Sequence, residues 1–411
     1  MPMDFLIDSA ARALAAGDPL GALNHIALRG DAAALALRGI AMAQLGDFRR
    51  AKTLLRCAAR GFDPKDALSR ARCVVAEAEI ALVSRELAWP EKALEAARAA
   101  LQAHGDPANA AHARHLQARR QLLIGRLDEA ERALAALDPA SLAPASRAVH
   151  ELIAAGIALR RLRMQPARAA LAQAELAAGH AGIPALMAEV ESASLVLSTP
   201  AARLVARGEE RLLLLDDVEA LLASDTLVVD ACRHAVREAG VTVPLASRPV
   251  LFALARALAE AWPHPAPRET LIAQAFRTAY FDETHRARLR VEIGRLRAAL
   301  RPVAGIVAAR NGFALKPREG RQAAVLARPV DDADREHGAI LAFLADGEAW
   351  SSSALALALN ASQRTVQRAL DALAAADKVQ SCGQGRARRW MTPPMPGFTT
   401  TLLLPAGLAG R

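Results

Sequence analysis

A run of arginines in the second half of the chain carries the strongest chemical signal in this sequence. Residues 281–302 contain six arginines and one histidine. Apolar residues recur among them at steps of four, three and four, which on an α-helix places them on one stripe. This stripe consists of Leu289, Ile293, Leu296 and Leu300. The spacing predicts a packed helix that buries an apolar seam and keeps its positive charge outside.

The other side chains of this helix form two groups around the helical wheel. The group opposite the seam is Arg288, Val291 and Arg295, and the group on one flank is Arg286, Arg290 and Arg297. Because a guanidinium presents a fork of donors that matches a guanine edge or a phosphate, the pattern is typical of a helix that contacts DNA. A solvated face of a surface helix is the alternative. Glu292 either accepts from a cytosine amine or pairs with a neighbouring arginine.

Residues that could catalyse a reaction or hold a metal ion form no comparable pattern. The chain contains no P-loop, HExxH, GxSxG or dinucleotide-binding fingerprint. His112 and His115 are interpreted as the polar face of a helix rather than as metal ligands. The cysteines show no CxxC spacing and are expected to be buried thiols: Cys57, Cys73, Cys232 and Cys382. We therefore expect no enzymatic activity, no metal and no cofactor.

Composition and charge place these arginines in a multidomain protein with an anionic partner. The 411 residues are 53% hydrophobic and only 3% aromatic, which favours several packed, mainly helical domains. The net charge is +9, and residues 248–330 hold 15 basic and 6 acidic residues, against 24 and 21 in 1–200. No apolar stretch has the length of a membrane span, and Asp4 and Asp8 do not fit a signal peptide. These features predict a cytoplasmic protein with no membrane partner.

The first half of the chain repeats a pattern of helix end, tight turn and alanine-rich helix. The copies, aligned on Ala51, Ala93, Ala130 and Ala167, are separated by 42, 37 and 37 residues, a period typical of helical solenoids. The motif LGDFRRA (45–51) resembles tetratricopeptide repeats, although the period is longer. The resemblance implies an α-solenoid over 1–197 whose concave surface binds a protein, peptide or small-molecule effector. Plain scaffolding and a homodimer interface are the alternatives.

Predicted helices and a hairpin surround the arginine-rich segment. RPVLFALARALA (248–259) and RETLIAQAFR (268–277) are two helices that precede it, and RLLLLDD (211–217) and VTVPL (241–245) are predicted strands further upstream. GIVAARNGFALKP (305–317) follows it as two short strands around Asn311-Gly312, a pair favoured in type I′ turns.

The segments VEIGRLRAAL and GIVAARNGFAL resemble the winged helix-turn-helix effector domain of OmpR/PhoB-type response regulators. The resemblance implies a DNA-binding domain over 205–318, with recognition helix 283–300 in the major groove. The wing, 305–316, would bring Arg310 and Asn311 to the adjacent minor groove. The receiver domain usual in that family is missing, so phosphorylation by a histidine kinase is not expected.

A second helix of similar character lies near the end of the chain. SQRTVQRALDALAAADKV (362–379), with Ser362 as its N-cap, resembles the recognition helix of small bacterial winged-helix domains. This resemblance implies a second winged helix over 331–395 that either contacts DNA or dimerises. Its candidate DNA contacts are Arg364, Gln367, Arg368, Arg386, Arg388 and Arg389. Residues 396–411 are expected to form an extended tail.

The sequence as a whole predicts a mainly α protein, with an N-terminal solenoid followed by two winged helices. The function that fits best is a transcription regulator that binds double-stranded DNA and receives a signal through its repeats. The alternative is a repeat-based adaptor whose winged helices mediate assembly rather than DNA binding.

Overall fold

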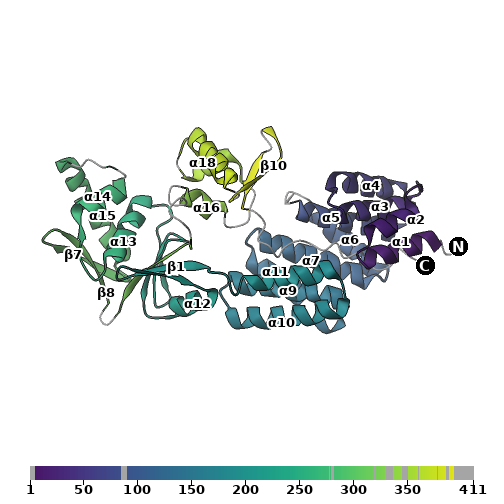
Figure 1. Ribbon diagram of the computed structural model, residues 1–411, viewed down its shortest axis with the longest axis horizontal. Helices are drawn as coiled ribbons and strands as arrows, with labels where there is room; N and C mark the ends of the chain where they lie inside the picture. Colours follow the sequence, from purple (N-terminus) through teal and green to yellow (C-terminus); the bar gives the residue numbers. More distant parts are fainter. Residues whose placement is uncertain are drawn as a thin grey trace. The chain divides into compact units, whose positions relative to one another are not determined.

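The computed structural model describes most of the chain and is mainly helical, as predicted (Figure 1). The described residues are 5–84, 90–276, 278, 282–318, 321–329, 337–344, 350–359, 361–376, 378–385 and 388–392. The chain divides into two compact units: residues 1–195 together with 343–411, and residues 196–342. No helix among the described residues combines the length and the apolar composition needed to cross a membrane.

Helices make up most of residues 5–84 and 90–195. Each packs chiefly on its neighbours in sequence, most extensively α3 on α4 and α9 on α10. The helices are α1 (Phe5–Ala15), α2 (Pro19–Ile26), α3 (Ala32–Gln44), α4 (Phe48–Gly61), α5 (Ala67–Val83), α6 (Glu91–Ala103), α7 (Pro107–Leu123), α8 (Leu127–Ala135), the 3₁₀ turn η1 (Pro139–Ser141), α9 (Pro144–Arg160), α10 (Met164–Ala181) and α11 (Pro184–Leu195).

Glycine–aspartate pairs form several of the turns between these helices. Gly46 has a φ of 86°, a conformation that L side chains rarely adopt, and it follows the end of α3. Asp47 then caps α4, because its carboxylate accepts a 3.0 Å hydrogen bond from the backbone N–H of Arg50. The same arrangement recurs at Gly17–Asp18 and Gly105–Asp106. One dipeptide thus ends a helix and starts the next.

Small residues let the helices approach closely. Of the four alanines on which the repeated segments align, Ala51, Ala130 and Ala167 are fully buried and Ala93 is partly buried. Gly39 of α3 faces this contact: a Cβ at Gly39 would lie 2.9 Å from Leu55 Cγ and 3.1 Å from the backbone oxygen of Ala51. The α3–α4 contact therefore has no room for a larger residue at position 39.

The unit at 196–342 is built around a six-stranded sheet in the order β2-β1-β9-β3-β4-β5. Its strands are β1 (Ala202–Ala206), β2 (Glu209–Leu213), β3 (Leu227–Asp230), β4 (Ala235–Glu238), β5 (Val241–Pro244) and β9 (Ala323–Ala327). Strand β9 runs antiparallel to β1 and parallel to β3. The chain therefore returns to the middle of this sheet after passing through the arginine-rich segment.

One of the two strands predicted in this region is present, and the other is present only in part. The predicted strand 241–245 is β5, but the segment 211–217 divides between β2 and a helix, α12 (Leu215–Ala223). Asp217 stabilises the start of α12, since its carboxylate accepts from the backbone N–H of Leu214. The sequence-based prediction of a strand was right for residues 211–213 and wrong for 214–217, because a run of leucines suits the start of a helix as well as a strand.

Three helices and a small sheet follow β5. The helices are α13 (Pro249–Ala261), α14 (Arg268–Phe276) and α15 (Glu283–Leu300), and the small sheet has the order β6-β8-β7, formed by β6 (Ala266–Pro267), β7 (Ala304–Ala309) and β8 (Gly312–Pro317). The predicted seam of α15 is confirmed, because Leu289, Ile293, Leu296 and Leu300 are all buried. They belong to one apolar core with α13, α14 and the hairpin β7–β8 (Figure 1).

The hairpin is present where the sequence predicts it, but its turn is different. Ala309 pairs with Gly312, so the two turn residues are Arg310 and Asn311. Neither has the positive φ that a type I′ turn requires. Gly312 instead begins β8, where a Cβ would lie 1.8 Å from the backbone oxygen of Ala266. Glycine is needed here for the close approach of β6, and not for the turn.

The remaining described elements lie after residue 337. They are α16 (Gly338–Leu344), α17 (Ser352–Leu359), α18 (Gln363–Ala375), β10 (Gln380–Cys382) and β11 (Arg389–Met391). Ser362 caps α18 as predicted, with its hydroxyl accepting from the backbone N–H of Thr365. Val366, Leu370 and Leu373 form a buried stripe on α18. The predicted tail 396–411 lies outside the described residues.

Candidate nucleic-acid interface

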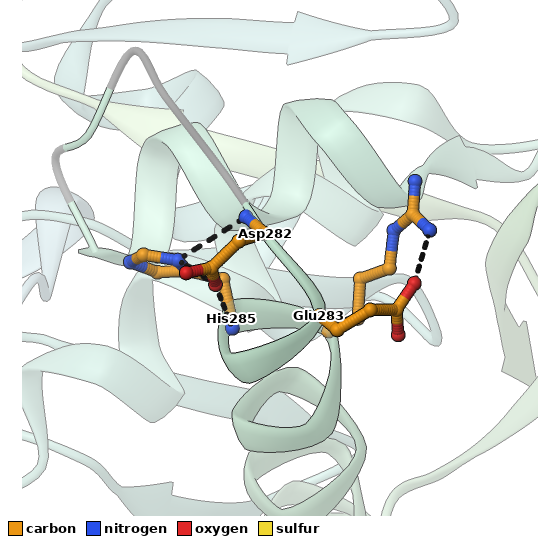
Figure 2. Close-up of polar contacts among 4 residues, drawn as sticks. Asp282, Glu283 and His285 are labelled. Carbon is orange, nitrogen blue, oxygen red and sulfur yellow. Dashed lines mark hydrogen bonds and ion pairs between the residues drawn. The ribbon is translucent and has the colours of Figure 1, made fainter.

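The arginine-rich helix α15 begins with a hydrogen-bonded cap. The carboxylate of Asp282 accepts a 3.0 Å hydrogen bond from the backbone N–H of His285, and His285 Nδ1 lies 2.8 Å from the same carboxylate oxygen (Figure 2). These hydrogen bonds hold the pKa of Asp282 below its ordinary value of 3.8. The charged carboxylate therefore anchors the first turn of α15, where the helix dipole also favours it.

Removing this cap should loosen the start of α15. We expect Asp282→Ala to lower the melting temperature by a few degrees at neutral pH, and Asp282→Ser to retain most of the wild-type value because a serine hydroxyl can also cap. Since folding lowers the pKa of Asp282, its contribution is present at neutral pH and disappears as the pH falls below about 3.8. Thermal unfolding at pH 7 and pH 3 measures both effects. Equal melting temperatures for the alanine and serine variants would contradict this role.

Three arginines of α15 are exposed and held by neighbouring side chains. Arg286 pairs with Glu283 at 2.5 Å, and Arg295 pairs with Glu292 at 2.8 Å. Of the two interpretations of Glu292, the structure shows the ion pair with a neighbouring arginine. The guanidinium of Arg288 lies over the ring of Phe276, 4.4 Å from its centre. Val291, on the same exposed face, keeps 54% of its surface accessible.

Two other arginines join the helices to the hairpin. Arg297 Nε donates to the backbone oxygen of Ile306 at 2.8 Å, and Arg268 donates to the backbone oxygen of Arg310 at 2.9 Å. Both guanidinium groups also lie within 6 Å of the Phe313 ring, at 5.7 Å for Arg268 and 5.8 Å for Arg297. Arg297, predicted as a flank contact, therefore also ties α15 to β7. The hairpin tip carries Arg310 and Asn311 as exposed residues.

A cleft of about 670 Å³ opens between the start of α14, the start of α15 and the hairpin. Three arginines and two glutamates give it a net positive lining: Arg268, Arg286, Arg290, Glu269 and Glu283. Asn311 reaches it from the hairpin tip. Arg268, which the sequence did not single out, belongs to this surface because β6 places the first turn of α14 beside β8.

Two of the candidate residues of the C-terminal region, Gln367 and Arg388, lie near the carboxylate of Asp371. Gln367 donates to Asp371 at 3.2 Å, and Arg388 lies 3.9 Å from the same carboxylate. Arg388 also covers the ring of the buried Trp390, 4.2 Å from its centre. Arg364 and Arg368 are exposed on α18, and Arg389 of β11 is partly exposed. Arg386 lies outside the described residues.

No family model, curated protein or solved structure matches the chain. The chemistry of the surface around α15 is that of an anion-binding face: exposed guanidinium groups fixed by carboxylates, an aromatic ring and backbone oxygens on a well-packed helix.

Other residues that could do chemistry are placed differently. Among the described residues, no group of three His, Cys, Asp or Glu side chains could hold a metal ion. Cys73 is buried, whereas Cys57 and Cys232 are partly accessible. Burial raises the pKa of Cys73 to about 12 and that of Cys232 to about 11, so both thiols are protonated at neutral pH. The side chain of Cys382 lies outside the described part of the chain.

The two histidines interpreted as a polar face are in fact buried. His112 is 9% exposed and His115 is fully buried. His112 Nε2 lies 2.8 Å from a carboxylate oxygen of Glu79, and His115 Nε2 lies 3.4 Å from His150 Nδ1. The prediction was wrong because these partners lie 33 and 35 residues away along the chain, a distance that local periodicity does not reveal.

Proposed function

We propose that this chain is a transcription regulator that binds double-stranded DNA through α15. The observation that carries the proposal is the combination of a fully buried apolar seam and exposed arginines on one helix, preceded by two helices and followed by an antiparallel hairpin. That order of elements is the order of a winged helix-turn-helix, in which the last helix enters the major groove. The proposed domain spans residues 205–318 and is of the OmpR/PhoB type.

In this proposal the side chains on different faces of α15 contact different parts of the DNA. Arg288, Val291 and Arg295 face base edges, and Arg286 and Arg290 meet phosphates together with Arg268. Arg310 and Asn311 at the hairpin tip reach the neighbouring minor groove. Arg297 keeps the hairpin at a fixed distance from the helix through its hydrogen bond to Ile306.

The rest of the chain would extend and control this interface. Residues 331–395 form a second winged helix that lengthens the DNA site through Arg364, Arg368, Arg388 and Arg389, with tethering raising its local concentration. Residues 1–197 form a tetratricopeptide-like solenoid that receives a protein, peptide or small-molecule signal in the cytoplasm. An effector can act only if it binds two states of the protein with different affinities.

The contribution of individual arginines can be measured on a duplex selected from random DNA by the full chain. We expect Arg288→Ala and Arg295→Ala each to weaken binding by about 1–3 kcal/mol and to relax the base preference, because an arginine fork bridges guanine O6 and N7. Arg286→Ala should weaken selected and unrelated duplexes alike, and reduce the slope of log K against log salt by about one. Fluorescence anisotropy at several salt concentrations gives both quantities.

Glu292→Gln is the matched control for these variants. It preserves the shape of the side chain but releases Arg295 from its 2.8 Å ion pair, so binding to unrelated DNA should become tighter and more salt-dependent. If all three alanine variants bind like the wild type, α15 does not contact DNA. A wild-type chain without salt-dependent DNA binding would instead favour the adaptor, in which the winged helices mediate assembly.

A further inference from the structure

Helix α7 of the N-terminal region buries a line of polar side chains that contact three different helices. His112 meets Glu79 of α5, His115 meets His150 of α9, and Arg119 meets Glu189 of α11. The positions 112, 115 and 119 lie on one face of α7 because they are three and four residues apart. Of these contacts, the Arg119–Glu189 ion pair spans the longest stretch of chain, 70 residues, at 2.8 Å.

Helix α11 has a small buried face for its length. Its 12 residues bury Leu186, Glu189 and Val190, whereas α10 buries seven residues. Helix α11 packs on α9 and α10 and is the last helix before the chain enters the second unit at residue 196 (Figure 1). Two aliphatic side chains and one carboxylate therefore form the buried face of the helix that joins the two units.

The packing of α11 on α9 and α10 depends on the buried carboxylate of Glu189 and its ion pair with Arg119. Glu189 is 1% exposed and Arg119 is 4% exposed, so both charges have left water. Arg119 Nε has no hydrogen-bond partner among the described residues, so the desolvation of that guanidinium is only partly compensated. A buried ion pair of this kind contributes little net stability, yet removing either partner leaves an uncompensated buried charge. The docked position of α11 is consequently sensitive to substitution of either of these two charged side chains.

We propose that α11 is a releasable latch: it undocks from α9 and α10 as a unit while the other helices stay folded, and the Arg119–Glu189 pair holds it closed. Release adds the 12 residues of α11 to the connection that leads into residues 196–342. A ligand or partner that prefers the undocked state shifts the equilibrium by its difference in affinity for the two states. The latch thereby gives the N-terminal region a means of changing how the second unit is tethered.

Hydrogen exchange of the full chain tests this proposal directly. In the wild type, the amides of 186–195 should exchange at least about tenfold faster than those in the middle of α9 and α10, because they open through a smaller event than unfolding of the unit. In Glu189→Gln and in Arg119→Met, exchange of α11 should rise by about a hundredfold while α9 and α10 keep their protection. The double variant Arg119→Met/Glu189→Leu replaces both charges by apolar groups and should restore protection of α11.

The outcomes separate a latch from an ordinary structural contact. Protection of α11 equal to that of α9 and α10 in the wild type would overturn the proposal, even if no variant folds. So would unchanged exchange of α11 in both single variants, or a loss of protection that spreads equally over α9, α10 and α11. Faster exchange confined to α11, reversed in the double variant, supports it.

Discussion

Replacing Gly312 by alanine is expected to destabilise the unit at 196–342 by more than about 2 kcal/mol. A Cβ at this position would lie 1.8 Å from the backbone oxygen of Ala266 and 3.1 Å from Cα of Pro267. Both neighbours are backbone atoms of β6, which pairs with β8, so the clash is relieved only by breaking that pairing. Chemical denaturation monitored by circular dichroism measures the loss.

The same change should also weaken the proposed DNA binding, through its effect on the hairpin. When β6 and β8 separate, Arg268 loses the backbone oxygen of Arg310 as its acceptor, and the arginine lining of the cleft is no longer fixed. Gly294→Ala is the control, because Gly294 lies in α15 and a Cβ there would have no neighbouring atom within 4 Å. That variant should be more stable by about 0.5–1 kcal/mol. Equal stability of the two alanine variants would contradict the close-approach argument.

The seam of α15 shows which parts of this fold could be predicted from the sequence. Leu289 and Leu296 are buried because a helix with this spacing has one face to bury, and this follows from local periodicity alone. Ser362 as the cap of α18 was predictable for the same reason, since a cap involves only its own first turn. The hairpin after α15 was also predictable as two apolar runs around a short polar turn.

Features that depend on contacts distant in sequence were not predictable in this way. Asn311-Gly312 looks like a turn pair, but the glycine is required by Ala266, which belongs to a different strand. Strand β9 completes the sheet from nearly a hundred residues beyond β3, and its composition resembles that of the surrounding alanine-rich helices. The local hydrophobic pattern does not show which of two apolar segments forms a strand that pairs with a distant sheet.

The candidate interface contains features that local sequence pattern predicts and features that depend on contacts distant in sequence. The sequence indicates that α15 exposes Arg288 and Arg295, and the structure shows both as exposed residues. It did not indicate that Arg288 would stack on Phe276 or that Arg297 would bond to the hairpin, because these partners lie on other elements. These contacts limit how far each guanidinium group can move, and therefore which of these groups can adapt to the DNA surface proposed as their partner.

The buried histidine pair leads to a prediction about pH. Burial, and after it the neighbouring charges of His112, His150 and Arg119, hold the pKa of His115 well below its ordinary value of 6.5. Because folding lowers this pKa, the unfolded chain binds the proton more readily. The stability that neutral His115 contributes is therefore complete above pH 6.5, and is lost as the pH falls below it.

We expect the free energy of unfolding of the N-terminal helices to fall by about 1.4 kcal/mol per pH unit below pH 6.5 on account of His115 alone. Burial also lowers the pKa of His150, which adds to the slope in the same direction. Urea denaturation of the full chain between pH 7.5 and 5, followed by helical circular dichroism, measures this dependence. Far less change over that range would mean that the pair accepts a proton in the folded state.

His115→Gln isolates the histidine from the other groups that titrate in this range. The glutamine amide can donate to His150 Nδ1 from nearly the position of His115 Nε2, 3.4 Å away in the wild type, but it does not titrate. The variant should be less stable than the wild type at pH 7.5, because the two side chains differ in shape, and its stability should fall less steeply with acid. The difference between the two slopes is the contribution of His115. Parallel slopes would show that acid acts through other groups, and that the pair is buried for packing alone.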